Sequence, residues 1–284
     1  MSRPDDPSAS RRSSRQALAF VVAVMILALG ARALVPWVGE GVLPLTMLTP
    51  ALAVLGIALL APRRPGEAGW LQGLGLRRAG LATWPLALGA PLLLHAAVLA
   101  ILAATRIAAL RPLSGGAADQ ALDLTAELVV GTLFALAEEL GWRGYLLPRL
   151  VTPLGAIRAM MLVGLLHGLW HLPVLLTTPY YHGGADPRVV VPLFLVALTL
   201  AGLFYGHLRL ATGSLWPVAL AHGAANAAWE LSSRLTTPRS QAALELWGGE
   251  SGLLVIAGLA GISLVVVGAW RGALPAAGRP VRAS

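Results

Sequence analysis

The chain contains no cysteine and no lysine, and each absence excludes some chemistry. Without cysteine there are no disulfides, no thiolate nucleophile and no cysteine ligands for a metal. Any catalysis therefore depends on carboxylates, imidazoles, hydroxyls or amides. All 21 basic residues are arginine, and they are spread over the loops. Such usage is typical of biased genomic base composition, so the net charge of +8 does not indicate a nucleic-acid-binding protein.

Charge of either sign is scarce in this chain. Only 12% of its 284 residues are charged, whereas 57% are hydrophobic, and the mean hydropathy is +0.73. An ordinary soluble domain carries about twice this share of charge. The composition therefore predicts a multi-span membrane protein whose main surroundings are the lipid bilayer.

Eight segments are long and apolar enough to cross a bilayer as helices, which takes about 20 residues. They lie at about 16–36, 43–62, 82–105, 124–148, 157–178, 189–209, 214–232 and 251–270. Turn-forming stretches connect them, and the chain shows neither an internal repeat nor a soluble domain. We expect an all-α, polytopic transmembrane helical bundle of about eight spans, forming one domain over residues 16–270.

The two ends of the chain differ from this domain. Residues 1–15 are polar and rich in arginine, and we expect a disordered cytoplasmic segment there, with a short cytoplasmic tail at 271–284. The sequence Ala31-Arg32-Ala33 is similar to a signal-peptidase site. Because further apolar spans follow, we interpret the first one as a retained helix.

The placement of arginine predicts the orientation, because cytoplasmic loops are enriched in basic residues. One set of helix ends carries Arg11, Arg12, Arg15, Arg63, Arg64, Arg77, Arg78, Arg149, Arg158, Arg209, Arg271, Arg279 and Arg282. The opposite set carries Arg106, Arg111, Arg188, Arg234 and Arg239. The excess on the first side predicts that both termini are cytoplasmic.

Three of the predicted spans contain polar residues at helical spacing. An ionisable residue inside a span costs about 2.5–3.5 kcal/mol on insertion scales, so each is a functional candidate. Residues four apart share a helix face, and the pairs are Glu139 with Arg143, His167 with His171, and His222 with Asn226, with Glu138 next to the first pair. If the three faces converge, they bring together the groups needed to activate water against an amide carbonyl.

Structural interpretations exist for each pair taken alone. Glu139 and Arg143 suit an intrahelical ion pair, His167 suits a core histidine, and His222 with Asn226 suits polar contacts between helices. Three such pairs in a chain with six histidines favour a common site. The remaining histidines are interpreted as structural or interfacial: His95, His182 and His207.

These motifs resemble the signature of the CPBP family, which includes type II CAAX prenyl endopeptidases and bacteriocin-immunity proteins. The similarity covers about residues 120–232, and "GLWHLP" and "GSLWPVALAHGAAN" resemble its bacterial branch. The resemblance implies that Glu138 is the general base for water, aided by His171, and that His222 and Asn226 bind the oxyanion. Glu139 and Arg143 would support them.

The chain departs from this family at His167, where phenylalanine is usual, so this histidine either adds a polar role or packs. Metal use is also open. The sequence has no HExxH zinc motif, yet Glu138, His171 and His222 could hold zinc by ligand type. We favour water activated by Glu138 without a tightly bound metal.

The resemblance thus implies an intramembrane endopeptidase of the bacterial inner membrane, acting on a peptide or membrane-protein substrate near the cytoplasmic face. One alternative is a non-catalytic immunity factor or scaffold in which the polar cluster links helices. A transporter is the third hypothesis. It is less favoured, because the sequence shows neither the repeated halves nor the paired broken helices that such folds tend to have. The natural substrate, its prenylation and the oligomeric state are left open by the sequence.

Overall fold

The computed structural model describes residues 7–60, 73–178 and 185–270. Apart from two short strands, the regular elements in these ranges are helices. They are α1 (Pro7–Val38), η1 (Glu40–Leu48), α2 (Thr49–Leu60), η3 (Leu81–Thr83), α3 (Trp84–Ala104), α4 (Ala117–Glu139), η4 (Leu140–Leu146), α5 (Leu147–Leu154), α6 (Ala156–Trp170), α7 (Leu172–Thr177), α8 (Pro187–Thr212), α9 (Trp216–Leu235), α10 (Gln241–Gly248) and α11 (Leu253–Trp270).

The predicted fold class, a polytopic helical bundle, is confirmed. Six helical stretches in the described ranges are long and apolar enough to cross a membrane. They are Arg11–Val38, Leu81–Ala104, Ala117–Leu154, Ala156–Thr177, Pro187–Thr212 and Gln241–Ala269. Large aliphatic side chains cover much of the outside, as on α1, α3 and α11, where Leu18, Leu93 and Leu264 are exposed. Such a surface suits lipid.

Two of the eight predicted spans differ from a long apolar helix. The apolar helical segment Pro44–Leu60 includes part of the 3-10 helix η1, and the described range ends at Leu60. The other is α9, which carries His222, Asn226, Glu230 and Arg234 and packs mainly against α4 and α3. Its polar residues lower its hydropathy while its neighbours cover it.

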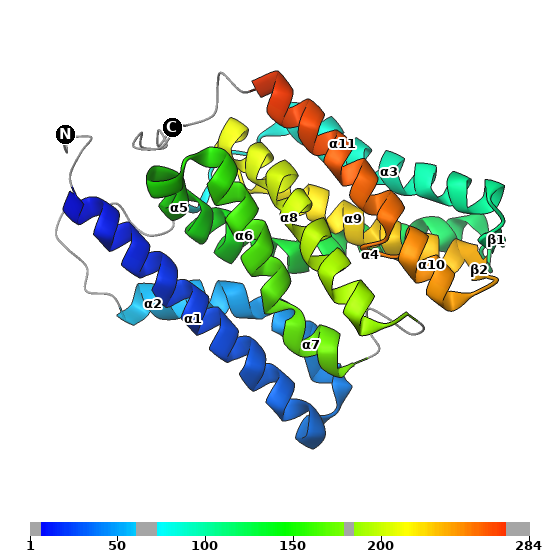
Figure 1. Ribbon diagram of the computed structural model, residues 1–284, viewed down its shortest axis with the longest axis horizontal. Helices are drawn as coiled ribbons and strands as arrows, with labels where there is room; N and C mark the ends of the chain where they lie inside the picture. The colour runs from blue at the N-terminus through cyan, green and yellow to red at the C-terminus, as the bar shows by residue number, and fades with distance from the viewer. Residues whose placement is uncertain (1–6, 61–72, 179–184, 271–284) are drawn as a thin grey trace.

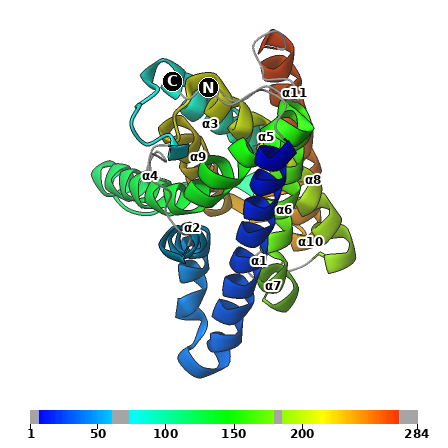
Figure 2. The ribbon, with the colours of Figure 1, turned by 90° about the vertical axis from the view of Figure 1, so that its left-hand side faces the viewer.

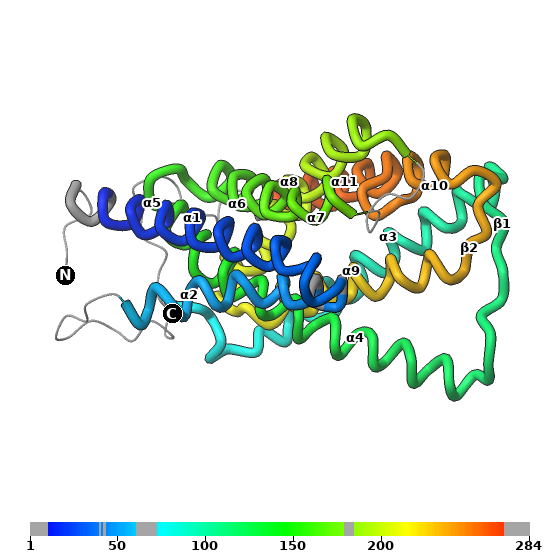
Figure 3. Tube along the Cα trace, turned by 90° about the horizontal axis from the view of Figure 1, so that it is seen from below, coloured from blue at the N-terminus to red at the C-terminus, as the bar shows by residue number. Residues whose placement is uncertain are grey.

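The molecule has two distinct ends along its longest axis (Figures 1 and 3). The start of α1 and helix α5 lie toward one end, on the left of Figure 1, which we call the α5 end. The strands β1 (Ala108–Leu110) and β2 (Thr236–Pro238) lie at the other, with α10 beside them. Seen along this axis, α1 and α2 pack side by side at one edge of the bundle (Figure 2).

The expectations for the N-terminal segment and the loops need two corrections. Residues 7–15, expected to be disordered, form the first turns of α1, because no glycine or proline interrupts the chain between Pro7 and Gly30. Residues 1–6 and 271–284 lie outside the described residues. The sequence also gave no indication of strands, yet β1 and β2 pair antiparallel, with Ala108 opposite Pro238, and join the loops after α3 and α9.

Glycines allow the central helices to approach closely. A Cβ atom on Gly223 of α9 would lie 2.5–2.7 Å from atoms of Thr132 on α4. A Cβ atom on Gly164 of α6 would lie 2.4 Å from the carbonyl oxygen of Leu198 on α8. Small residues at such crossings are typical of packed membrane helices. These contacts hold α9 against α4 and α6 against α8.

Candidate active site

The two adjacent glutamates lie where α4 changes its winding. The helix ends at Glu139 and continues without a break as the π-helical turn η4 into α5. Such wide turns are frequent at functional sites. The turn is tightly packed, because a Cβ atom on Gly141 would lie 2.6 Å from Pro50 and 2.7 Å from Phe20. The packing of η4 against α1 and α2 therefore fixes the end of α4.

Glu139 connects α4 to α9. Arg143 donates from Nη1 to Glu139 Oε1 over 2.8 Å, and both side chains are fully buried. His222 Nδ1 lies 2.9 Å from the same oxygen. Because a carboxylate only accepts hydrogen bonds, Nδ1 of His222 carries the proton and donates it to Glu139. The ion pair expected within the helix is present, and it also holds a histidine of another helix.

Glu138 is bound by His167, the residue that stands at the family's phenylalanine position. His167 Nε2 lies 2.8 Å from Glu138 Oε2, and Arg143 Nη1 lies 3.2 Å from His167 Nδ1. A guanidinium has only donors, so Nδ1 of His167 accepts, and its Nε2 must carry the proton that Glu138 accepts. The ring also stacks on Trp142, with centroids 5.0 Å apart. His167 therefore has a polar role as well as a packing role.

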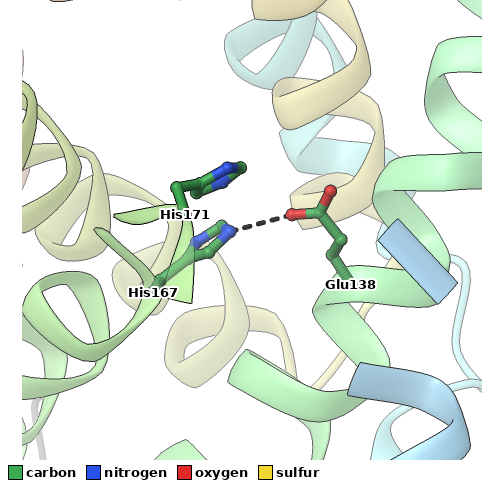
Figure 4. Close-up of side chains that lie close together, drawn as sticks. All are labelled: Glu138, His167 and His171. Carbon is green, nitrogen blue, oxygen red and sulfur yellow. Dashed lines mark hydrogen bonds and ion pairs between the residues drawn. The ribbon is translucent and has the colours of Figure 1, made fainter. Parts of the chain in front are cut away.

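His171 lies at the break between α6 and α7. Pro173 lacks the N–H that would continue the helical pattern, so α6 ends at Trp170. The ring of His171 is half-buried, with its centroid 5.2 Å from that of His167 and 5.3 Å from that of Phe194. Figure 4 shows the two imidazoles side by side with Glu138 opposite them. The break thus places a histidine against the glutamate of another helix.

The four residues predicted to be catalytic line one cavity of about 750 Å³. They are Glu138, His171, His222 and Asn226. The three others, Glu139, Arg143 and His167, are fully buried and are not among the residues that line the cavity. A cavity of this size is typical of sites for small ligands or short stretches of peptide. The polar cluster therefore has a face toward the cavity and a supporting layer behind it.

The cavity-facing side of α9 is held by aromatic and charged neighbours. The ring of Tyr205 stacks on His222 with centroids 5.4 Å apart, and the Arg143 guanidinium lies 5.1 Å from the centre of the Tyr205 ring. The carboxamide of Asn226 makes no hydrogen bond to the rest of the described chain. It is half-buried and free to donate into the cavity.

A metal is compatible with part of this cluster. Ligand atoms of Glu138, His167 and His171 lie within 4.8 Å of one another. His167 is a poor ligand, because Arg143 occupies the lone pair on Nδ1 and the proton occupies Nε2. His222 is a better one: a histidine whose Nδ1–H is held by a carboxylate presents Nε2 in the manner common among zinc ligands. The cluster of close ligand atoms thus contains two of the three predicted ligands, Glu138 and His171, with His167 in place of His222.

Sequence reasoning missed Glu250, which lies in the turn between α10 and α11 and also lines the cavity. Its only mark in the sequence is a lone glutamate in "WGGESG", directly before an apolar span. Of the other histidines, His95 lines a small adjoining chamber, His207 is buried in α8, and His182 lies outside the described residues.

The fold and the site together define a polytopic membrane protein with a buried glutamate–histidine centre that faces a cavity. Residues 121–228 match the family model described as type II CAAX prenyl endopeptidase Rce1-like. This segment contains all seven residues singled out above, and the match confirms the resemblance to the CPBP family over these residues without distinguishing its bacterial branch. The family implies a protease. No curated protein matches the chain.

Proposed function

We propose that the protein is an intramembrane endopeptidase that uses water activated by Glu138 to hydrolyse a peptide bond near the cytoplasmic face. The observation that carries this proposal is the common cavity. The four family residues Glu138, His171, His222 and Asn226 line it, while their hydrogen-bonded partners lie behind it. Such an arrangement presents reactive groups to a substrate and restrains them from the other side.

Glu138 acts as the general base. The N–H of His167 holds its Oε2, which leaves its second oxygen to accept a proton from water, and His171 on the same cavity helps to hold that water. The water oxygen attacks the carbonyl carbon as its proton passes to Glu138. When the carbon–nitrogen bond breaks, Glu138 returns the proton to the leaving nitrogen. The products are a carboxylic acid and an amine.

The oxyanion is bound by Asn226 and His222 on α9. The carboxamide of Asn226 donates directly. His222 donates from Nε2 only when both of its nitrogens are protonated, because Nδ1 already donates to Glu139. The negative charge of Glu139 stabilises such an imidazolium. Glu139 therefore supports the reaction through His222, as a positioning residue.

A zinc-dependent version would use Glu138, His171 and His222 as ligands, and the metal would polarise the carbonyl and activate water. In that version His222 would stay neutral, and the lone pair on its Nε2 would bind the metal. We favour the version without a tightly bound metal, in which the N–H of His167 orients the carboxylate. Elemental analysis of the purified protein distinguishes the two.

The proposed location is a bacterial inner membrane with both termini in the cytoplasm. It is supported by the arginines gathered at the α5 end of the bundle, which include Arg11, Arg149 and Arg158. The proposed substrates are peptides or membrane proteins with a cleavable bond that reaches the cavity. Neither a prenyl group nor a bacterial origin is required by the site itself.

Comparative proteomics of membranes tests the activity. Membranes that contain the wild-type protein should accumulate shortened peptides that are absent with Glu138→Gln, because the amide cannot accept the proton from water. The variant keeps the size of the side chain, and its insertion and thermal stability are measured as the control. Identical peptide profiles in the two membranes would contradict a protease.

A scaffold is the second candidate, because Glu138–His167 and Glu139–His222 join three helices through buried hydrogen bonds. Under this hypothesis, loss of stability precedes any loss of function. If Glu138→Ala and His171→Ala unfold at lower temperature while every cleavage product persists, the cluster serves to link helices.

A further inference from the structure

Glu250 places a carboxylate beside the proposed oxyanion residues, although it belongs to none of the three motifs and lies outside the matched segment 121–228. It lines the main cavity together with His222 and Asn226. It also lines a second, mainly apolar chamber of about 80 Å³, which shares Trp229 with the main cavity. Glu250 therefore lies where the two spaces meet.

Apart from the imidazoles of His171 and His222, the ionisable side chains on the cavity wall are all acidic. Among its described lining residues, four are glutamates and none is an arginine. Glu127 is paired with Arg234, and Glu138 accepts from His167. Glu230 is exposed. These three carboxylates are thus paired or lie on the outside of the protein.

Glu250 differs from these three. It is half-buried, and it forms no hydrogen bond or ion pair with the rest of the described chain. A carboxylate in a chamber lined mainly by apolar side chains such as Leu198 and Val255 is costly unless a cation or a donor compensates it, and His222 is its electrostatic partner in the described chain. Trp229 lines the same two spaces, and a cavity that offers both an indole ring and a carboxylate suits a cationic group.

We propose that Glu250 and Trp229 form a subsite that binds a basic side chain, arginine or lysine, of the peptide substrate. The subsite adjoins His222 and Asn226, so a bound cation places a nearby peptide bond against Glu138. The apolar chamber takes a small aliphatic side chain of the same peptide. This proposal rests on the proposed function, because it names the peptide that the site selects.

The test uses the full-length protein in lipid nanodiscs and fluorogenic peptides that share one apolar sequence and vary at a single position. Wild-type protein should prefer arginine or lysine over glutamine at that position. In Glu250→Gln the ratio of kcat/KM for the arginine peptide over the glutamine peptide should fall about tenfold. The matched control is Glu230→Gln, the same change at an exposed residue of the same cavity, which should keep the preference. An unchanged ratio in Glu250→Gln would overturn the subsite.

A binding measurement separates this proposal from the proteolysis on which it rests. Fluorescence anisotropy of the arginine peptide is measured on Glu138→Gln protein, with and without Glu250→Gln. The added substitution should weaken binding of the arginine peptide about tenfold and leave the glutamine peptide less affected. Equal affinity of both proteins for the arginine peptide would refute the subsite, even when no peptide is cleaved. Absence of cleavage by wild type together with selective binding would instead refute only the proposed protease.

Discussion

Glu138 and Glu139 are neighbours in the sequence but have different partners. Successive helical residues point about 100° apart, so one carboxylate faces the cavity and His167 while the other faces Arg143 and His222. Arg143 bonds both Glu139 and His167, and so connects the two halves of the cluster. A change at any of these buried residues is expected to reach the cavity through its partners.

Replacement of His167 by phenylalanine, the usual family residue, tests whether this histidine positions Glu138. Loss of a hydrogen bond to a charged group costs about 1.5–3 kcal/mol, so we expect kcat to fall roughly 10- to 100-fold. KM should change little, because His167 does not line the cavity. His167→Gln can donate to Glu138 and accept from Arg143, so it should restore part of kcat. Full activity in His167→Phe would show that the histidine only packs.

The sequence predicted the residues of this cluster better than their hydrogen bonds. Spacing of four placed Glu139 with Arg143, and His222 with Asn226, on common faces, because one helix determines both positions. It could not predict that Arg143 would fix the proton of His167 on Nε2, since that contact joins residues of two helices. Glu250 was missed for a different reason: a lone glutamate in a turn has no periodic pattern.

At the scale of elements, local geometry explains where prediction succeeded and failed. The long apolar helices follow from composition, because the bilayer requires every backbone group to be bonded within the helix. The π turn at Leu140–Leu146 and the break at His171 depend on packing and on Pro173, and both lie at the site. Close crossings at glycines hold α9 against α4 and α6 against α8, and hydropathy contains no information on such crossings.

Gly223→Ala tests the crossing of α4 and α9. The new methyl would lie 2.5–2.7 Å from Thr132, closer than real contacts allow, so α9 must move. Gly223 follows His222, and its displacement should lengthen the bond to Glu139 and lower kcat. Overpacking of this kind costs about 1–3 kcal/mol of stability.

The matched control is Gly89→Ala in α3, where nothing lies within 4 Å of the new methyl. Activity and unfolding temperature should stay at wild-type levels in this variant. Wild-type kcat in Gly223→Ala would contradict this role of the crossing.

For the whole molecule, the orientation in the membrane decides which compartment the cavity serves. Glu138 lies about 30 Å along α4 from Ala117, at 1.5 Å per residue, on the side where α4 continues through η4 into α5. The α5 end carries the arginines at the start of α1 together with Arg149 of α5 and Arg158 of α6, whereas Arg32 lies near the other end of α1. The opposite end carries the β1–β2 ribbon and its own arginines, such as Arg111, whose Nε donates to the carbonyl of Arg234. The predicted orientation therefore rests on a difference in the number of arginines between two basic ends. The orientation itself needs a direct measurement.

Thiol labelling can measure the orientation. Because the chain contains no cysteine, one introduced thiol is unique. Ala79 is exposed in the segment that contacts the start of α9, and Thr237 is exposed on β2 at the opposite end. We expect Thr237→Cys to react with a membrane-impermeant maleimide in intact cells, and Ala79→Cys to react only after lysis. The two variants are each other's control, since both thiols are exposed and both should react in detergent. The reverse pattern would place the α5 end outside the cell, and cleavage near that end would then occur at the outer face of the membrane.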